Sequence, residues 1–220
     1  MTEPTIRVLV VDDHDIVRGG LRALLSGCED IEVVGEAANG QEAVQEVKRH
    51  KPDVVLMDLM MPEMDGIEAT ERITGEYPNM RVLVLTTFST EDLVFPAIKA
   101  GAHGYLLKDS GSDRVEEAIR LVHRGEPSLH PDVARMLMQE VRPEKPKAPA
   151  PDPLTPRELE VLSMLARGIS NQEISDELVI AEVTVRSHIS RILDKLHLAN
   201  RVQATLYALR EGMVDLDEHP

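Results

Sequence analysis

Five polar residues in the first half of the chain stand where short apolar runs end. They are Asp12, Asp13, Asp58, Thr86 and Lys108. Carboxylates that lie close together repel one another unless a cation neutralises them, and a hard ion with oxygen ligands such as Mg²⁺ suits that task. A lysine adds a compact positive charge for phosphate, and a threonine adds a hydroxyl donor. These residue types predict phosphoryl transfer, with Asp58 as the nucleophile, if the fold brings them together.

Alternating apolar and amphipathic segments predict the elements that position these residues. Five short apolar runs are typical of strands, at 6–11, 32–37, 53–58, 81–86 and 104–108. Apolar residues three and four apart indicate core-facing helices at 16–27, 40–50, 66–77, 91–101 and 112–125. Right-handed crossovers then favour an α/β fold, a doubly wound, five-stranded parallel sheet in the flavodoxin-like order 2-1-3-4-5. Because strands 1 and 3 are neighbours in that order, the carboxylates meet at one edge.

A proline-rich stretch divides the chain into two parts. Residues 142–153, "RPEKPKAPAPDP", contain five prolines and suit an extended spacer. Residues 1–127 are therefore predicted as one domain, 128–153 as a connecting helix with the spacer, and 154–220 as a second domain. The connecting helix is expected over "SLHPDVARMLMQEV", residues 128–141.

The composition excludes several classes of protein. A single cysteine, Cys28, cannot form an internal disulfide, and no apolar run reaches the roughly 18 residues of a membrane span. The first residues, "MTEPTIRVLVV", lack the features of a signal peptide. We therefore expect a cytoplasmic protein without a membrane-spanning segment.

The second part of the chain predicts a small all-α domain. Thr155, Pro156 and Glu158 make a strong helix start, and this helix is expected to end at Gly168. Three further helices are expected at 171–178, 183–196 and 201–210. A short helix, a turn and a longer helix form a helix-turn-helix pattern. The second part is therefore predicted to be a four-helix domain that contains this motif.

The helix at 183–196 carries a locally positive face. Arg186, Ser187, Ser190, Arg191 and Lys195 are expected to point outward. Residues 183–201 have a net charge of +3, inside a domain whose net charge is −4. Such a face is suited to contact DNA bases and phosphates. A charged, solvated helix face accounts for the cations about as well.

The motifs of the first domain resemble those of response-regulator receiver domains. The resemblance lies in the paired acids after the first strand, in "VVLMDLMMPEMDG" (54–66) and in "YLLKD" (105–109), and it covers residues 5 to about 125. It implies that Asp58 is the phosphoacceptor. It also implies that Mg²⁺ is held by Asp12, Asp13, Asp58 and the main-chain carbonyl of Met60.

The same resemblance assigns the residues that respond to the phosphoryl group. Thr86 is implied as the switch hydroxyl and Tyr105 as the aromatic side chain that reorients with it, while Lys108 binds phosphate. Taken one at a time, Thr86 would be an ordinary strand residue, Tyr105 a core residue, and Asp12 and Asp13 helix caps. Their joint placement at strand ends favours the phosphoacceptor site.

The motifs of the second domain resemble the LuxR-type DNA-binding domain. They are "LTPRELEVL", "GISNQEISDEL", "TVRSHISRILDKL" and "RVQA", within residues 153 to about 212. Joined to a receiver, the domain resembles the NarL/FixJ family of two-component response regulators. This implies that a sensor histidine kinase phosphorylates the protein, which then binds promoter DNA as a homodimer to regulate transcription, with RNA polymerase as a candidate further partner. The implied DNA contacts are Thr184, Arg186, Ser187, His188, Ser190, Arg191 and Lys195.

Three other interpretations lead to different functions. An enzyme of the haloacid dehalogenase type also uses a strand-end aspartate and Mg²⁺, but it needs a second acid two residues later, where Met60 stands. We therefore expect the domain to catalyse only its own phosphorylation and slow dephosphorylation. C-terminal helices that bind a protein partner would also suit the acidic second domain. The third interpretation is a transcription factor that acts without phosphorylation.

Overall fold

The computed structural model of the protein describes residues 5–140 and 153–213. They belong to two compact units, which divide after Ala134. The predicted spacer, residues 142–153, falls outside the described residues apart from Pro153, and the predicted domain boundaries at 127 and 153 stay predictions. Within the described ranges, no helix is long and apolar enough to cross a membrane.

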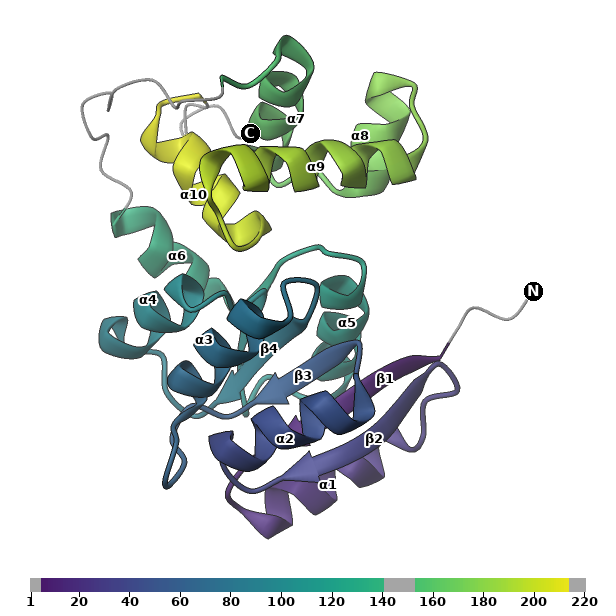
Figure 1. Ribbon diagram of the computed structural model, residues 1–220, viewed down its shortest axis with the longest axis vertical. Helices are drawn as coiled ribbons and strands as arrows, with labels where there is room; N and C mark the ends of the chain where they lie inside the picture. Colours follow the sequence, from purple (N-terminus) through teal and green to yellow (C-terminus); the bar gives the residue numbers. More distant parts are fainter. Residues whose placement is uncertain (1–4, 141–152, 214–220) are drawn as a thin grey trace. The chain divides into compact units, whose positions relative to one another are not determined.

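The N-terminal unit is built on a parallel sheet of six strands (Figure 1). In chain order these are β1 (Ile6–Val11), β2 (Ile31–Ala37), β3 (Val54–Met57), β4 (Arg81–Thr86), β5 (Gly104–Leu107) and β6 (Ser128–Leu129). Their order in space is β2-β1-β3-β4-β5-β6. This confirms the predicted fold and the predicted order of the first five strands, and it corrects the strand count from five to six.

The sixth strand shortens the helix that was expected over 128–141. Ser128 pairs with Gly104 and Leu129 with Tyr105, so the chain extends the sheet by one edge strand before it turns into α6 (Pro131–Glu140). Pro131 suits the first turn of a helix, where its missing N–H is not needed. The predicted helix is confirmed over Pro131–Glu140, but Ser128 and Leu129 pair with the free edge of β5 instead.

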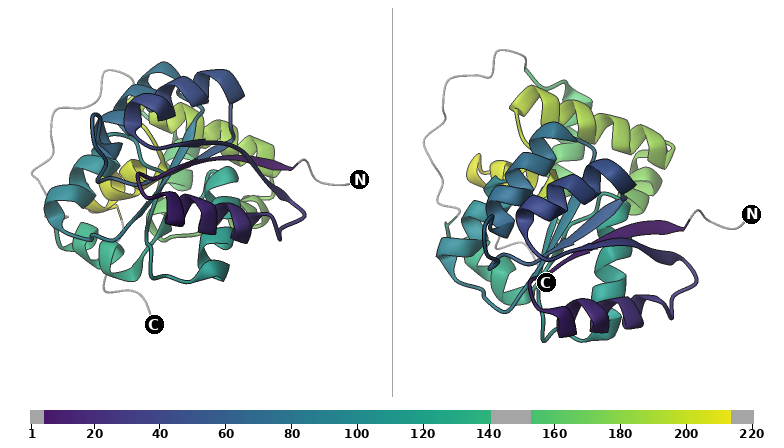
Figure 2. Two further views of the ribbon diagram at one scale, coloured as in Figure 1. Left: turned by 90° about the horizontal axis from the view of Figure 1, so that it is seen from below. Right: turned by 60° about the horizontal axis from the view of Figure 1, so that its bottom comes forward.

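Five helices cover the two faces of the sheet. They are α1 (Asp15–Leu25), α2 (Gly40–His50), α3 (Gly66–Glu76), α4 (Glu91–Lys99) and α5 (Ser112–His123). Figures 1 and 2 show α1 and α5 on one face and α2 and α3 on the other. Val8 of β1 lies in the same hydrophobic cluster as Ile119 of α5, while its neighbour Leu9 lies in the cluster that contains Val47 of α2 and Ile73 of α3. Successive strand residues therefore serve opposite cores, which explains why the strands are apolar nearly throughout.

The C-terminal unit consists of four helices. They are α7 (Pro156–Ala166), α8 (Asn171–Leu178), α9 (Glu182–Leu196) and α10 (Arg201–Arg210). The predicted bounds of α8 and α10 are confirmed, and α9 starts one residue earlier than predicted. Thr155 and Ser170 each form a reciprocal capping box with the glutamate three residues later, which fixes the starts of α7 and α8. The core includes Val161, Leu162, Ile174, Val185, Ile189 and Ile192.

A half-buried histidine, His103, directly precedes β5 and makes the N-terminal unit sensitive to acid. The main-chain N–H of His103 donates to Val82 O at 2.8 Å. Burial lowers the pKa of the His103 imidazole to about 4, and the charge of Arg81 acts in the same direction. The unfolded chain binds this proton near the ordinary pKa of 6.5. The unfolded state therefore gains protons first as the pH falls, and stability is lost between pH 6.5 and 4.

We expect His103 to steepen the loss of stability by up to about 1.4 kcal/mol per pH unit between pH 6 and pH 4.5. Amide hydrogen exchange of peptides that cover β4 and β5 measures this slope in the intact chain. In His103→Gln the excess slope should vanish, because glutamine does not titrate. A slope that is the same in both proteins would contradict the assignment.

Candidate functional site

Asp12, Asp58 and Lys108 meet at the carboxyl ends of β1, β3 and β5. Val11 lies opposite Met57 in the pairing of β1 with β3, so the next residue of each strand, Asp12 and Asp58, leaves the sheet beside the other. Lys108 Nζ lies 2.6 Å from Asp12 Oδ2 and 2.6 Å from Asp58 Oδ2. The two aspartates are only 1% and 5% exposed. A single ammonium therefore compensates two buried carboxylates, as such buried charges require.

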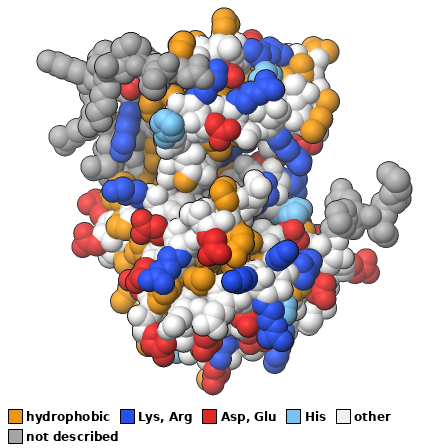
Figure 3. Space-filling view, viewed as in Figure 1, with side chains coloured by type: hydrophobic (Ala, Val, Ile, Leu, Met, Phe, Trp, Pro, Cys, Tyr) orange, Lys and Arg blue, Asp and Glu red, His pale blue; other side chains and the backbone are white. Residues whose placement is uncertain are grey.

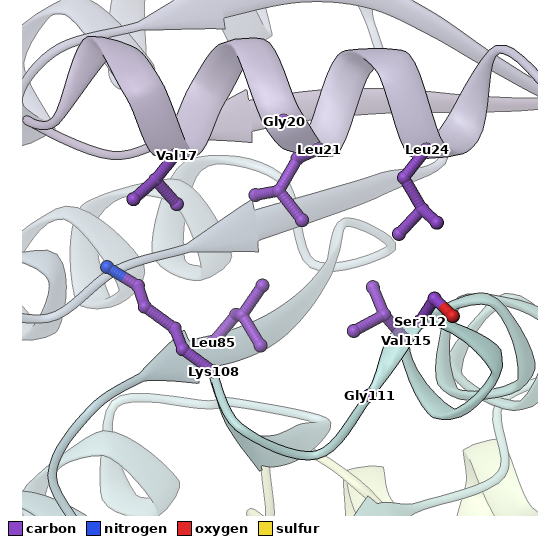
Figure 4. Close-up of a pocket in the computed structure, with 9 residues that line it drawn as sticks. All are labelled: Val17, Gly20, Leu21, Leu24, Leu85, Lys108, Gly111, Ser112 and Val115. Atoms are coloured by element: carbon purple, nitrogen blue, oxygen red, sulfur yellow. The ribbon is translucent and has the colours of Figure 1, made fainter.

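Lys108 stays protonated in this position. Burial lowers the pKa of its ammonium, but the hydrogen bonds that it donates to Asp12 and Asp58 outweigh burial and raise the pKa above its usual value. The same side chain lines a groove of about 340 Å³ between α1 and α5 (Figure 4). The apolar lining of the groove is Val17, Leu21, Leu24, Leu85 and Val115. Lys108 thus belongs both to the carboxylate site and to this surface.

A tight turn holds the main chain around Asp58. The N–H of Leu59 donates to Asp58 Oδ1 at 2.7 Å, and the N–H of Gly66 donates to Leu59 O at 2.9 Å. A Cβ atom on Gly66 would lie 1.9 Å from the main-chain oxygen of Asp58, so only glycine fits. The glycine of "PEMDG" therefore allows α3 to begin directly against the chain that carries Asp58.

Asp13 and His14 extend the acidic site beyond the two buried carboxylates. Asp13 Oδ1 lies 2.7 Å from His14 Nδ1, and the main-chain N–H of His14 donates to Asp12 Oδ1 at 2.9 Å. Ligand atoms of Asp12, Asp13 and His14 all lie within 4.8 Å of one another. Sequence reasoning missed His14, although its place directly after two acids was a signal. The carboxylate oxygens fit Mg²⁺, whereas the imidazole nitrogen is not a ligand that this ion favours.

Thr86 and Tyr105 are both fully buried beside this site. Among the described residues, the Thr86 hydroxyl has no hydrogen-bond partner, which is rare for a buried polar group. The Tyr105 hydroxyl donates to Phe88 O at 2.8 Å. Burial, and after it the charge of Asp58, raises the pKa of Tyr105 above its usual range, so this hydroxyl stays a donor. Thr86 is therefore free to donate to an incoming acceptor.

The outward face of α9 combines cations, hydroxyls and one apolar side chain. Its exposed residues include Val183, Arg186, Ser187, Ser190 and Arg191. This orientation is as expected for the last four, and their contact with DNA stays a prediction. Arg186 Nη2 lies 2.6 Å from Glu182 Oε1, one turn earlier on the same helix. Thr184 and His188 are half-buried, so they lie at the margin of the face.

Lys195 does not point freely outward, and that part of the sequence prediction is wrong. Its side chain is 20% exposed, and its Nζ lies 3.0 Å from Glu158 Oε2 on α7. Glu158 is itself buried and also accepts a hydrogen bond from the Thr155 N–H at 2.8 Å. These three residues tie the start of α7 to the last turn of α9. The contact joins residues 37 positions apart, which helical periodicity does not reveal.

Two protein families match the chain. Residues 8–120 match the response regulator receiver domain, and residues 152–208 match the bacterial regulatory proteins of the luxR family. The transcriptional regulatory protein LiaR of Bacillus subtilis (strain 168) is 46% identical over 210 residues, which cover 96% of this chain and 100% of LiaR. The chain belongs to the response regulators with a LuxR-type DNA-binding domain.

Solved structures agree with this response-regulator architecture. The crystal structure of the response regulator ChrA from a heme-sensing two-component system is 38% identical, with a TM-score of 0.53, and covers 96% of this chain and 99% of ChrA. A structure of two RcsB dimers bound to two parallel DNAs is 25% identical, with a TM-score of 0.56, and covers 94% of this chain and 98% of RcsB. The predicted resemblance to NarL/FixJ-family response regulators is confirmed.

Glu158 should make the C-terminal unit of this response regulator lose stability in acid. The Thr155 N–H is the main cause that lowers the pKa of the Glu158 carboxyl to about 2; burial opposes the shift, and the hydrogen bond from Lys195 supports it. The unfolded carboxyl titrates near 4.5. The folded carboxyl therefore holds its stabilising charge above pH 4.5, and this stability is lost as the pH falls from 4.5 towards 2.

We expect Glu158→Gln to lower the free energy of unfolding of this unit by about 2 kcal/mol at pH 7 and to flatten the pH dependence below 4.5. Amide hydrogen exchange of peptides from α7 and α9 measures both effects. Glu160→Gln, which changes an exposed acid of the same helix, is the matched control. Equal stability of the two variants at pH 7 would contradict the role of the buried contact.

Proposed function

We propose that Asp58 accepts a phosphoryl group from a sensor histidine kinase, and that phosphorylation enables this regulator to bind promoter DNA as a homodimer. The observation that carries the proposal is the contact of Lys108 with Asp12 and Asp58 at 2.6 Å. It supports a site that is already arranged for a group with negative charge. In the transfer, a carboxylate oxygen of Asp58 forms a bond to phosphorus, and the bond from phosphorus to the histidine nitrogen breaks.

Asp12, Asp13, Asp58 and the main-chain carbonyl of Met60 are proposed to hold Mg²⁺. The ion would neutralise the crowded carboxylates and the negative charge of the phosphoryl oxygens. Lys108 is proposed to exchange a carboxylate partner for a phosphoryl oxygen, because its ammonium is held beside the Asp58 carboxylate. Each of these roles uses an oxygen or a cation that lies at the carboxyl end of the sheet.

Thr86 and Tyr105 are proposed to respond to the new charge. The buried Thr86 hydroxyl lacks a partner among the described residues, and a phosphoryl oxygen on Asp58 would provide one. Movement of Thr86 would change the surroundings of Tyr105, whose hydroxyl donates to the main chain at Phe88. The added charge would then shift the population of two arrangements of β4, β5 and their neighbouring helices.

Intact mass after incubation with acetyl phosphate and Mg²⁺ tests the receiver half of this proposal. We expect the wild type to gain one phosphoryl group and Asp58→Asn to gain none, because asparagine is no nucleophile for this transfer. Asp92→Asn, a change at an exposed acid of α4, is the control and should behave as the wild type. Equal gain in Asp58→Asn would place the acceptor elsewhere, and no gain with several small phosphoryl donors would contradict the receiver chemistry.

Self-dephosphorylation is expected to be slow. Met60 and Phe88 each stand two residues beyond a site residue and are 52% and 46% exposed, so both are placed to flank a phosphoryl group on Asp58. Neither side chain can orient an attacking water. Once acetyl phosphate is removed, the phosphorylated mass should persist for minutes or longer, and Met60→Gln should shorten its lifetime. A half-life of seconds in the wild type would contradict this expectation.

The exposed face of α9 is proposed to contact promoter DNA. Arg186 and Arg191 would reach bases or phosphates, Ser187 and Ser190 would donate weaker hydrogen bonds, and Thr184 and His188 would contact the backbone from the margin of the face. Lys195 has the least support of the predicted residues, because Glu158 holds its ammonium. The RcsB structure shows dimers of that protein on DNA. Pairing suits this acidic domain, because two copies add their phosphate contacts.

Retention of DNA in a gel separates DNA binding from a protein-partner function of the C-terminal helices. We expect the phosphorylated wild type to retain a DNA site selected from a random pool, and Arg186→Ala to weaken this binding by about 1–3 kcal/mol. Arg210→Ala, which removes an exposed cation of α10, is the control and should have a smaller effect. If the phosphorylated wild type retains no DNA in a sequence-specific way, the protein-partner interpretation is favoured. We propose that the protein acts in the cytoplasm and that RNA polymerase is a candidate further partner.

A further inference from the structure

We infer that Val183 contacts the methyl group of a thymine in the major groove and so makes thymine a part of the recognised DNA site. The inference rests on the proposed function and goes beyond it by naming a residue that reads a base. Val183 is the second residue of α9, and 73% of its surface is exposed. In helix-turn-helix proteins, the first residues of the recognition helix are those that approach base edges.

Val183 lies on the same face of α9 as the polar residues proposed to contact DNA. Arg186, Ser187 and Ser190 follow it by three, four and seven positions, and this spacing places all four side chains on one face of the helix. All four are exposed. The opposite side of the helix carries Val185, which is fully buried. The exposed valine therefore continues the proposed DNA-contacting face and makes no contribution to the core.

The chemistry of valine selects one group of the major groove. Valine has no hydrogen-bond donor or acceptor, and its branched side chain is stiff, so it cannot turn away to let a polar group take its place. The 5-methyl group of thymine is the apolar feature that the four base pairs present in this groove. Arg186, one turn further along, would reach a neighbouring guanine or a phosphate, with Glu182 holding its guanidinium at 2.6 Å. The pair would combine an apolar contact with a charged contact.

The surface around α9 is mixed in character rather than purely basic. Figure 3 shows exposed hydrophobic side chains among Lys and Arg side chains over the helices of the C-terminal unit. Val179, in the turn between α8 and α9, is 88% exposed, but it precedes the recognition helix. It therefore provides a matched control for the loss of an exposed valine.

Removal of single methyl groups from DNA tests the contact. A DNA site is first selected from a random pool with the intact, phosphorylated wild type, and thymines are then replaced at random by deoxyuridine, which lacks only the 5-methyl group. Positions where uracil weakens binding are mapped for the wild type, Val183→Ala and Val179→Ala. For the wild type we expect a weakening of about 4-fold at the contacted thymine, the value for one buried methyl group.

The predicted result is that Val183→Ala loses its sensitivity to uracil at this position and keeps it elsewhere, while Val179→Ala retains the full wild-type pattern. Should Val183→Ala bind too weakly to map, Val183→Ser supports the same comparison, because its side chain carries no methyl group. A wild-type pattern in the Val183 variants, or no uracil-sensitive position in the wild type, overturns the inference while DNA binding stands. Failure of the wild type to select any DNA overturns the proposed function and this inference with it.

Discussion

One ammonium between two buried carboxylates determines how the carboxyl end of the sheet is arranged. Lys108 lies 2.6 Å from both Asp12 and Asp58, which are almost completely removed from water. Burying carboxylates costs several kcal/mol each unless a cation and hydrogen bonds compensate them. This requirement links β1, β3 and β5, because the three residues follow these strands, and the contact reaches across β4, which lies between β3 and β5. Thr86 ends β4 and is consequently enclosed beside the same carboxylates.

The shared position of Lys108 also connects the site to the outer surface of the receiver. Its stem lines the groove between α1 and α5, and its ammonium binds the carboxylates. A cation or a phosphoryl group that binds at the Asp12 and Asp58 carboxylates must change the partners of the Lys108 ammonium. Tyr105 provides a second connection, through its hydrogen bond to the main chain at Phe88. A change of charge at the site can therefore affect neighbouring elements in two ways, through Lys108 and through Tyr105.

The C-terminal unit uses a buried acid in a different way. Glu158 caps the start of α7 and binds Lys195 of α9, so that one cation of α9 stabilises the fold. The exposed arginines of the described part of α9 are Arg186 and Arg191, and Arg186 is itself paired with Glu182. The outward face therefore has few cations for DNA phosphates. If this face contacts DNA as proposed, its apolar and hydroxyl side chains must supply more of the recognition.

Periodicity and strand-end residues by themselves determined most of the architecture. The strand order, the bounds of α8 and α10, and the meeting of Asp12, Asp58 and Lys108 followed from local patterns and the handedness of crossovers, because covalent order and side-chain spacing control these features. Only the tertiary structure decided which neighbours satisfy each polar group. Ser128 and Leu129 pair with the open edge of β5, and Glu158 binds Lys195. These contacts join residues through burial and electrostatics in space, which no spacing along the chain encodes.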